Sequence, residues 1–166
     1  QIVIGSSMGG WIMLLVALAR RERVKGLIGI AAAPDFTEEL IWRSLSEAEQ
    51  ARLMREGRLA QPSEYSEEPY VITRKLIEDG RKHLLLGQPI AVDAPVRLLQ
   101  GMADPDVPFH TAERLAKRLT SKDVTVTLVK DGDHRLSRPQ DLARLEAAIE
   151  ELIQAPDARI AGNPSR

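Results

Sequence analysis

The stretch Gly5-Ser6-Ser7-Met8-Gly9 decides the fold of this chain because of what lies on either side of it. It comes directly after the apolar segment Ile2-Val3-Ile4, which is typical of a buried strand, and before an apolar segment at residues 11–19 that predicts a helix. A G-x-S-x-G pattern between a strand and a helix is typical of a sharp turn that presents its serine as a nucleophile. We therefore expect Ser7 to lie in a strained conformation at the head of a helix.

Two expectations follow from the shape of such a turn. Side chains at positions 5 and 9 would collide in so sharp a bend, which explains a glycine at each. The backbone N–H of Met8, at the start of the helix, is placed to face an oxyanion that forms on a bound substrate. The pattern alone is also compatible with an ordinary structural turn, so the interpretation depends on finding an acid and a base.

The composition is that of an ordinary globular domain. The chain has 166 residues, of which 43% are hydrophobic and 28% charged, and its formal net charge is −1. This balance gives no indication of binding to nucleic acid or to an anionic membrane. There is no cysteine, which excludes disulfides, thiol catalysis and cysteine-ligated metal. No apolar run is long enough to span a bilayer, and the first residues do not resemble a signal peptide.

Strand-like and helix-like segments alternate along most of the chain. We predict strands at residues 1–4, 24–31, 96–99 and 123–130, and helices at residues 8–20, 109–119 and 138–153. This alternation is typical of a parallel α/β sheet covered by helices on both faces. Because residue 1 already falls within a predicted buried strand, we expect an upstream portion, including further strands, to be missing from the sequence.

The first and last predicted helices have apolar residues at helical spacing. In the first helix these residues are Trp11, Ile12, Leu15 and Leu18. In the last helix they are Leu142, Leu145, Ile149 and Leu152, which we predict to be buried. Ser137, with Gln140 three positions later, is predicted to cap the start of that last helix.

Residues 35–90 interrupt the alternation. A capping box at Ser46-Glu47-Ala48-Glu49 predicts a helix that ends near Gly57, residues 61–69 form a polar loop, and residues 70–86 predict another helix with an interruption at Gly80. An insertion between two core strands would sit over the ends of the sheet, where open α/β folds bind ligands. We interpret residues 35–90 as a lid, with a packing decoration as the alternative. Residues 1–34 and 91–155 then form the core, and residues 156–166 a loose tail.

The candidate acid follows the predicted strand at residues 96–99. Asp104 lies a few residues beyond that strand, where the acid of a Ser-His-Asp triad is expected. Asp106 is the nearby competitor, and we expect it instead to shape the turn and to cap the next helix. Asp35, after the strand at residues 24–31, is a weaker alternative.

The candidate base follows the last predicted strand. His134 lies in the loop Asp131-Gly132-Asp133-His134-Arg135, from which an imidazole can lean over the ends of the sheet. The other two histidines, His83 and His110, are more typical of surface or packing residues. The chemistry assigns Ser7 as the nucleophile, His134 as its general base and Asp104 as the group that orients the imidazole.

The order Ser7, Asp104, His134 is that of the α/β-hydrolase superfamily, and the chain resembles its C-terminal two-thirds. More closely, it resembles the mitochondrial palmitoyl-protein thioesterases, which also hydrolyse acyl glucuronides, and their bacterial relatives. The resemblance rests on residues 5–11, 62–68, 94–102, 104, 107–111 and 133–135. Many relatives have His where this chain has Gln100, a position outside the triad.

The resemblance implies a serine hydrolase that cleaves esters or thioesters with a long or bulky acyl group through an acyl-enzyme. Ser7, Asp104 and His134 are then the triad, and Met8 supplies one oxyanion donor. The second donor normally comes from a loop after an earlier strand, so we expect these 166 residues alone to have little or no activity. Another chemistry on the same fold, such as C–C bond hydrolysis, and a non-catalytic binding module are the alternatives.

The expected partner is a small-molecule ester or acyl thioester, or an acylated protein, and not a nucleic acid. We expect no cofactor and no metal. Relatives of this kind place the protein in the bacterial cytoplasm or in mitochondria, a choice that these residues do not decide.

Overall fold

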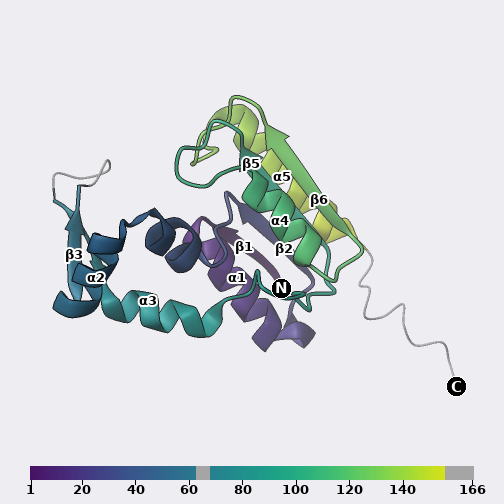
Figure 1. Cartoon of the computed structure of the whole chain (residues 1–166). Helices are drawn as coiled ribbons and strands as arrows, with labels where there is room; N and C mark the ends of the chain where they lie inside the picture. Colours follow the sequence, from purple (N-terminus) through teal and green to yellow (C-terminus); the bar gives the residue numbers. More distant parts are fainter. Residues whose placement is uncertain (63–67, 156–166) are drawn as a thin grey trace, which may run out of the picture. The chain divides into compact units, whose positions relative to one another are not determined.

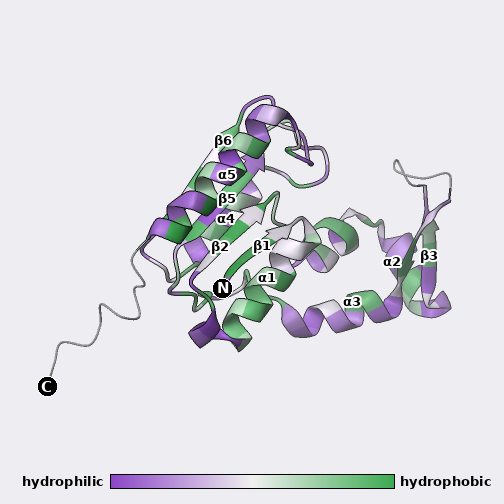
Figure 2. Cartoon of the chain, turned by 180° about the vertical axis from the view of Figure 1, so that it is seen from behind, coloured by the Kyte–Doolittle hydropathy of each residue, from purple (hydrophilic) through white to green (hydrophobic). Residues whose placement is uncertain are grey.

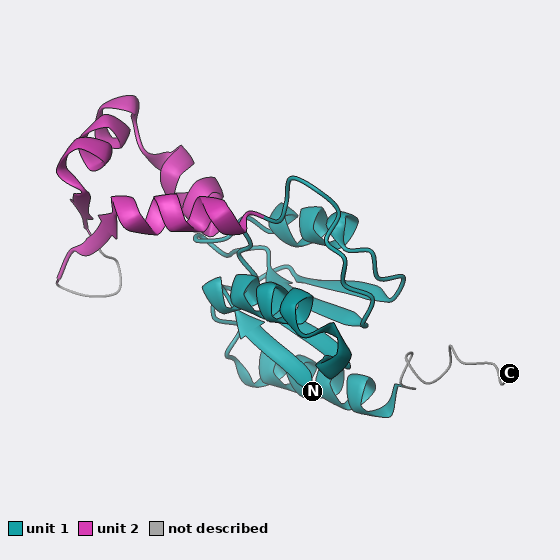
Figure 3. Ribbon diagram, turned by 90° about the horizontal axis from the view of Figure 1, so that it is seen from below, with its two compact units in different colours: residues 1–34, 85–166 teal, residues 35–84 magenta. Residues whose placement is uncertain are grey.

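The computed structural model describes residues 1–62 and 68–155, and the chain divides into two compact units (Figure 3). Unit 1 comprises Gln1–Pro34 and Leu85–Arg166, and unit 2 comprises Asp35–Leu84. Two segments lie outside the described residues. They are residues 63–67, which belong to the predicted polar loop and to the 62–68 segment of the resemblance, and the predicted tail at residues 156–166.

Unit 1 contains a four-stranded sheet in the order β1-β2-β5-β6 (Figure 1). Its strands are β1 (Ile2–Ser6), β2 (Gly26–Ile30), β5 (Val96–Gly101) and β6 (Val124–Val129). All three pairings are parallel, with Ser6 opposite Ile30 and Ile30 opposite Leu99, so the carboxyl ends of the strands lie along one edge. The predicted parallel α/β sheet is confirmed.

Three helices pack on this sheet: α1 (Met8–Ala19), α4 (His110–Arg118) and α5 (Pro139–Gln154). Helices α1 and α5 cover opposite faces, because neighbouring residues of β2 contact them in turn. Ile28 packs against Leu152 of α5, whereas Gly29 lies beside Met13 of α1. Figure 2 shows the corresponding pattern, in which α1 is largely hydrophobic and α5 alternates between hydrophobic and hydrophilic residues.

The apolar spacing of α1 does not coincide with its buried face. Trp11 is buried, but Ile12 is 49% exposed, and Met13 and Leu14 are buried. The cause is that α1 is apolar on every side, so that the periodicity of the sequence does not indicate which side faces the sheet.

The predicted start of α5 was also wrong. The helix begins after Arg138 rather than after Ser137, and no side chain caps it. Pro139 occupies the first helical position, where its fixed φ favours helix initiation. Leu142 is 45% exposed, because the inward-facing place in the first turn is taken by Asp141, whose carboxylate is hydrogen-bonded to Arg138.

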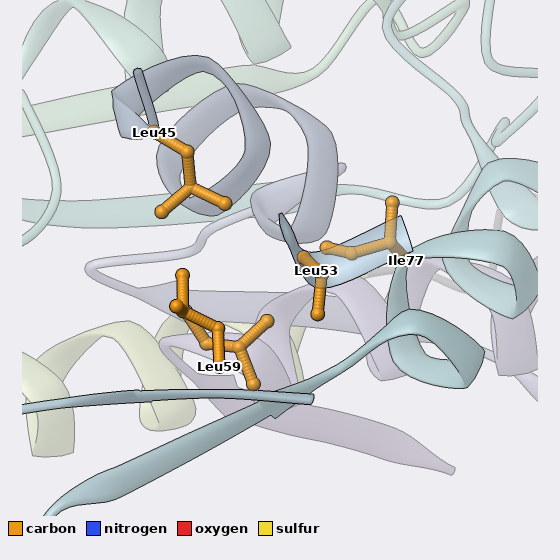
Figure 4. Packing of buried hydrophobic residues seen from close by; sticks show 5 residues of the cluster. Leu45, Leu53, Leu59 and Ile77 are labelled. Carbon is orange, nitrogen blue, oxygen red and sulfur yellow. The ribbon is translucent and has the colours of Figure 1, made fainter. Parts of the chain in front are cut away.

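Unit 2 has a small hydrophobic core of its own. Its elements are two short helical turns (Thr37–Ile41 and Trp42–Ser44), α2 (Glu47–Glu56), β3 (Arg58–Gln61), β4 (Tyr70–Thr73), α3 (Arg74–Gly80) and a final turn (Arg81–His83). The core consists of the buried side chains of Leu45, Leu53, Leu59, Ile72 and Ile77 (Figure 4).

Helix α2 begins and ends as predicted. The Ser46 hydroxyl accepts a hydrogen bond from Glu49 N at 3.3 Å, and the Glu49 carboxylate accepts one from Ser46 N at 2.8 Å, which completes the capping box. Gly57 ends the helix in the left-handed conformation, at φ 79°.

The predicted helix at residues 70–86 was wrong in its first part. Residues 70–73 form β4, which pairs antiparallel with β3 so that Ile72 lies opposite Leu59. Tyr-Val-Ile-Thr is rich in aromatic and β-branched residues, which favour a strand. Helix α3 follows, with the Thr73 hydroxyl accepting from Leu76 N at 3.1 Å, and it ends at Gly80, close to the predicted interruption.

Candidate active site

Ser7 joins the end of β1 to the start of α1 in a strained backbone conformation. Its φ of 53° and ψ of −122° lie in a region that residues other than glycine rarely adopt. Backbone hydrogen bonds hold it there: Ser7 N donates to Ile30 O at 2.9 Å, and Ser7 O accepts from Gly10 N at 2.9 Å and from Ala33 N at 3.0 Å. The predicted strained turn is therefore present.

Close packing around this turn explains one of the two glycines that flank Ser7. A Cβ atom at Gly5 would collide with the carbonyl group of Gly9, so that position requires glycine. A Cβ atom added at Gly9 would meet no other atom within 4 Å, so the prediction that a side chain at position 9 would collide was wrong. The close approach on that side of the turn is made by Gly10, which packs directly against Ala32.

Asp104 lies in the loop after β5 with its side chain fully buried, at 0% exposure. Its Oδ1 accepts hydrogen bonds from Asp106 N at 2.8 Å and from Val107 N at 2.9 Å. Its Oδ2 accepts from the side-chain amide of Gln100 at 3.1 Å. These three donors hold the carboxylate of Asp104 in a fixed plane without any contribution from His134.

His134 lies in the loop after β6 and is hydrogen-bonded to this carboxylate. Its Nδ1 is 2.9 Å from Asp104 Oδ2. A carboxylate only accepts, so the bond places the imidazole proton on Nδ1 and leaves the lone pair of Nε2 available to take a proton. Asp106 Oδ2 is 3.9 Å from the same nitrogen, too far for a hydrogen bond. Asp106 does not cap α4 either, because Phe109 is the residue that precedes that helix.

The two loops meet through direct backbone contacts. Ala103 N donates to Gly132 O at 3.0 Å, and Met102 N donates to Val129 O at 2.8 Å. A Cβ at Gly101 would collide with the carbonyl group of Gly132, so a glycine at that position lets the loops approach this closely. The His134 turn is closed by Asp133, whose Oδ1 accepts from Leu136 N at 2.9 Å.

Ser7, Asp104 and His134 all follow the carboxyl ends of parallel strands of one sheet, β1, β5 and β6. Within residues 1–62 and 68–155, the structure joins Asp104 to His134 by a hydrogen bond but joins neither to Ser7. Met8 is the first residue of α1, so its N–H has no acceptor within the helix. Hydrogen bonds between catalytic groups often shorten only when substrate binds.

The remaining candidates from the sequence lie elsewhere. Asp35 belongs to unit 2, where it is buried at a φ of 59° and its carbonyl accepts from Glu38 N and Glu39 N. His83 and His110 are both exposed. In the part of the chain that the structure describes, the hydrogen bonds of Asp104 and His134 involve Gln100, Asp106, Val107 and one another.

Asp104, Asp106 and His134 lie close enough together to be considered as metal ligands, with ligand atoms within 4.8 Å of one another. The hydrogen bonding argues against that use. The Asp104 carboxylate already accepts four hydrogen bonds, which occupies its lone-pair directions, and the His134 Nδ1 that lies near it carries a proton. The arrangement suits an acid–base pair better than a metal centre.

Gln100 is a residue of this site that was not predicted from the sequence. It is fully buried near the end of β5 and donates to Asp104. The signal was present in the sequence as an amide side chain in an otherwise apolar strand, four positions before the candidate acid.

A serine on a strained strand-to-helix turn, followed in the chain by a hydrogen-bonded Asp–His pair at the same edge of a parallel sheet, defines the α/β-hydrolase class. Residues 1–154 match the model of the prolyl oligopeptidase family, and the chain belongs to that family.

The resemblance to palmitoyl-protein thioesterases is confirmed. The chain is 42% identical over 154 residues to human palmitoyl-protein thioesterase ABHD10, mitochondrial, an alignment that covers 92% of this chain and 50% of the human protein. The rat protein of the same name is 43% identical over 154 residues, with coverage of 92% and 52%. The chain thus spans about half the length of the curated relatives it matches.

The fold agrees with solved structures of similar sequence. A putative hydrolase from Agrobacterium vitis S4 is 48% identical, with a TM-score of 0.87. Alpha/beta hydrolase domain-containing protein 10 from mouse is 41% identical, with a TM-score of 0.83. Each comparison covers 92% of this chain and 61% of the other. In the described residues, no helix has the length and apolar character needed to cross a bilayer.

Proposed function

We propose that this chain carries the nucleophile, base and acid of a serine hydrolase that cleaves carboxylic esters or thioesters. The observation that supports it most is the 2.9 Å hydrogen bond from His134 Nδ1 to the buried Asp104, at the sheet edge where Ser7 is held in a strained turn. Similarity to a palmitoyl-protein thioesterase supports an acyl thioester, free or on a protein, as the substrate class.

The roles follow from the protonation state of the pair. His134 Nε2 removes the proton of the Ser7 hydroxyl as Ser7 Oγ attacks the acyl carbon. The protonated imidazole is stabilised by Asp104 and then gives its proton to the departing thiol or alcohol, which leaves an acyl group on Ser7. Water, deprotonated by His134, attacks that acyl group, and the carboxylic acid is released.

The N–H of Met8 stabilises the oxyanion of both tetrahedral intermediates. A preorganised backbone donor of this kind is worth roughly 3–4 kcal/mol of barrier. We propose this activity for the native protein.

We propose further that unit 2 acts as a lid over the acyl group. In support, unit 2 begins at Asp35, a few residues after the carboxyl end of β2. Ser7, Asp104 and His134 likewise follow the carboxyl ends of their strands. Ligands of open α/β sheets bind at this edge.

Turnover of three substrate classes by the native protein tests the proposed function: p-nitrophenyl esters, acyl thioesters and acyl glucuronides. We expect acyl thioesters to be hydrolysed and Ser7→Ala to lower kcat by roughly 10⁴-fold or more. Ser6→Ala is the matched control, since it removes the neighbouring hydroxyl of the same turn, and it should leave kcat unchanged. Equal loss in both variants, or full activity of Ser7→Ala, would contradict the assignment of the nucleophile. Inactivity on all three classes would favour another chemistry, such as C–C bond hydrolysis.

A further inference from the structure

Gln100 is a buried amide in a strand whose other residues are also buried. It has 0% exposure, and β5 is buried along its whole length. An amide is seldom placed in such a position unless its polar atoms are needed there, because a buried polar group must find hydrogen-bond partners.

The nitrogen and the oxygen of this amide differ in their hydrogen bonding. Nε2 lies 3.1 Å from each of three acceptors: Asp104 Oδ2, Val107 O and Gly101 O. Oε1 is buried and has no donor among the described residues. Rotating the amide by half a turn would place its oxygen against three other oxygens, so the orientation of the N–H groups is fixed.

The amide therefore acts on the acid and on the loop that carries it. Asp104 Oδ2 has two partners in the described structure, the Gln100 amide and His134 Nδ1. The second acceptor, Val107 O, belongs to a residue whose N–H binds Asp104 Oδ1. The Gln100 side chain thus holds Oδ2 directly and Oδ1 through Val107. The Asp104 side chain is fully buried, so water does not compete for these bonds.

We propose that Gln100 is a positioning residue for the Asp104–His134 pair. Its N–H group keeps Asp104 Oδ2 directed at His134 Nδ1, and the unsatisfied Oε1 is the consequence of aiming the amide this way. The inference rests on the proposed hydrolase function for its effect on turnover. Its effect on the hydrogen bond between Asp104 and His134 does not depend on that function.

Three substitutions at this position separate positioning from packing. Gln100→Leu and Gln100→Met fill a similar volume but remove the donor, whereas Gln100→His restores an N–H group near the carboxylate. The matched control is Leu98→Val, which shortens a buried aliphatic residue two positions earlier in β5, a residue that has no donor to offer Asp104.

Two measurements on the native protein are required. The first is steady-state kinetics with an acyl thioester: Gln100→Leu and Gln100→Met should lower kcat by about 10- to 100-fold with little change in KM. Gln100→His should recover most of this loss, and Leu98→Val should lower thermal stability but not kcat. The second is the downfield proton NMR signal of the His134 Nδ1–H in the resting protein, which should shift or broaden in the Leu and Met variants only.

Folded Leu or Met variants with the kcat and the downfield signal of the wild type would overturn the proposal. So would a Gln100→His variant that folds but loses as much kcat as Gln100→Met. If Gln100→Leu does not fold, the Met and His variants decide the matter. Failure of the proposed function is recognised separately, because Ser7→Ala would then retain turnover whatever the NMR signal of the Gln100 variants shows.

Discussion

Unit 1 and unit 2 are held together over different distances along the chain. In unit 1 the Asp104–His134 bond joins residues 30 positions apart, and the Arg97–Glu151 ion pair joins residues 54 apart. In unit 2 the capping box spans three positions and the Arg52–Glu56 pair four, while the Arg81–Glu38 pair joins residues 43 apart and the bond from Arg74 Nη1 to Met54 O joins residues 20 apart. The site of unit 1 therefore depends on a bond between distant loops, whereas unit 2 combines local helix contacts with a few contacts between distant residues.

The difference also concerns what is buried. Unit 2 has a core of five aliphatic side chains. Unit 1 buries the polar residues Arg97 and Gln100 in β5 and Asp141 in α5, whereas the buried polar residues of unit 2, Asp35 and Thr37, lie outside its aliphatic core. Buried polar groups need specific partners, so they fix one arrangement of the loops, whereas an aliphatic core tolerates changes of similar volume.

The largest effect is expected where a long-range contact of unit 1 is broken at the site. Asp104→Asn keeps the shape of the side chain but lets its NH₂ donate to His134, which favours the wrong imidazole tautomer. We expect kcat for an acyl thioester to fall by roughly 10³- to 10⁴-fold, with the fold retained. Asp106→Asn is the control, with a far smaller effect. If Asp106→Asn caused the larger loss, the assignment of the acid would be wrong.

The next effect concerns the small core of unit 2. Leu53 is fully buried, and Leu53→Ala should lower the stability of this unit by about 2–5 kcal/mol, through lost burial and a cavity. Amide hydrogen exchange should show the loss of protection in α2, β3 and β4 and leave β5 and β6 unchanged. Leu53→Met, which conserves volume, is the control. Equal loss of protection in both units would show that they unfold together.

A smaller effect is expected from a buried charge of unit 1. The hydrogen bond from Arg138, with a further contribution from Arg144, holds the pKa of Asp141 below its usual range. A depressed folded pKa stabilises the protein above the unfolded pKa, and this contribution is lost as the pH falls through the folded value. Asp141→Asn should therefore lower stability by about 1–3 kcal/mol at neutral pH.

Chemical denaturation at several pH values tests this expectation. The difference in unfolding free energy between the wild type and Asp141→Asn should be constant from about pH 5 to neutrality and should shrink below about pH 4. A difference that instead grew toward low pH would contradict the assigned direction of the pKa change.

The smallest effect is expected at the cap of α2. Ser46→Ala removes the side-chain acceptor for Glu49 N and should lower the stability of unit 2 by about 1 kcal/mol. Ser46→Asp supplies another acceptor and should restore most of it, as read from the thermal unfolding of each variant. A Ser46→Ala protein as stable as the wild type would show that the capping box adds nothing measurable.

The sequence allowed much of unit 1 to be predicted, because its strands are short apolar runs and its loops carry glycines and aspartates in a recognisable order. The parallel sheet was predicted correctly, and so was the strained conformation of Ser7. The side of α1 that faces the sheet could not be predicted, since a helix that is apolar on all sides does not indicate which side is buried. The part played by Gln100 depends on a hydrogen bond to Asp104 that only the folded loop creates.

Unit 2 was predicted less well for a related reason. Its capping box is a local signal and was read correctly, but the pairing of β3 with β4 was missed. Each of these strands has only four residues, too few for a period of two to be distinguished from the start of a helix. The pairing of two strands across a loop depends on tertiary structure, and it cannot be predicted from such short segments.

The most direct test of the central claim is the reaction of the folded native protein with a fluorophosphonate, followed by mapping of the modified residue by mass spectrometry. The account predicts a single modification on Ser7, none on the adjacent Ser6, and much slower reaction after His134→Ala. A folded protein that stays unmodified, or one that reacts at Ser7 equally fast without His134, would contradict it.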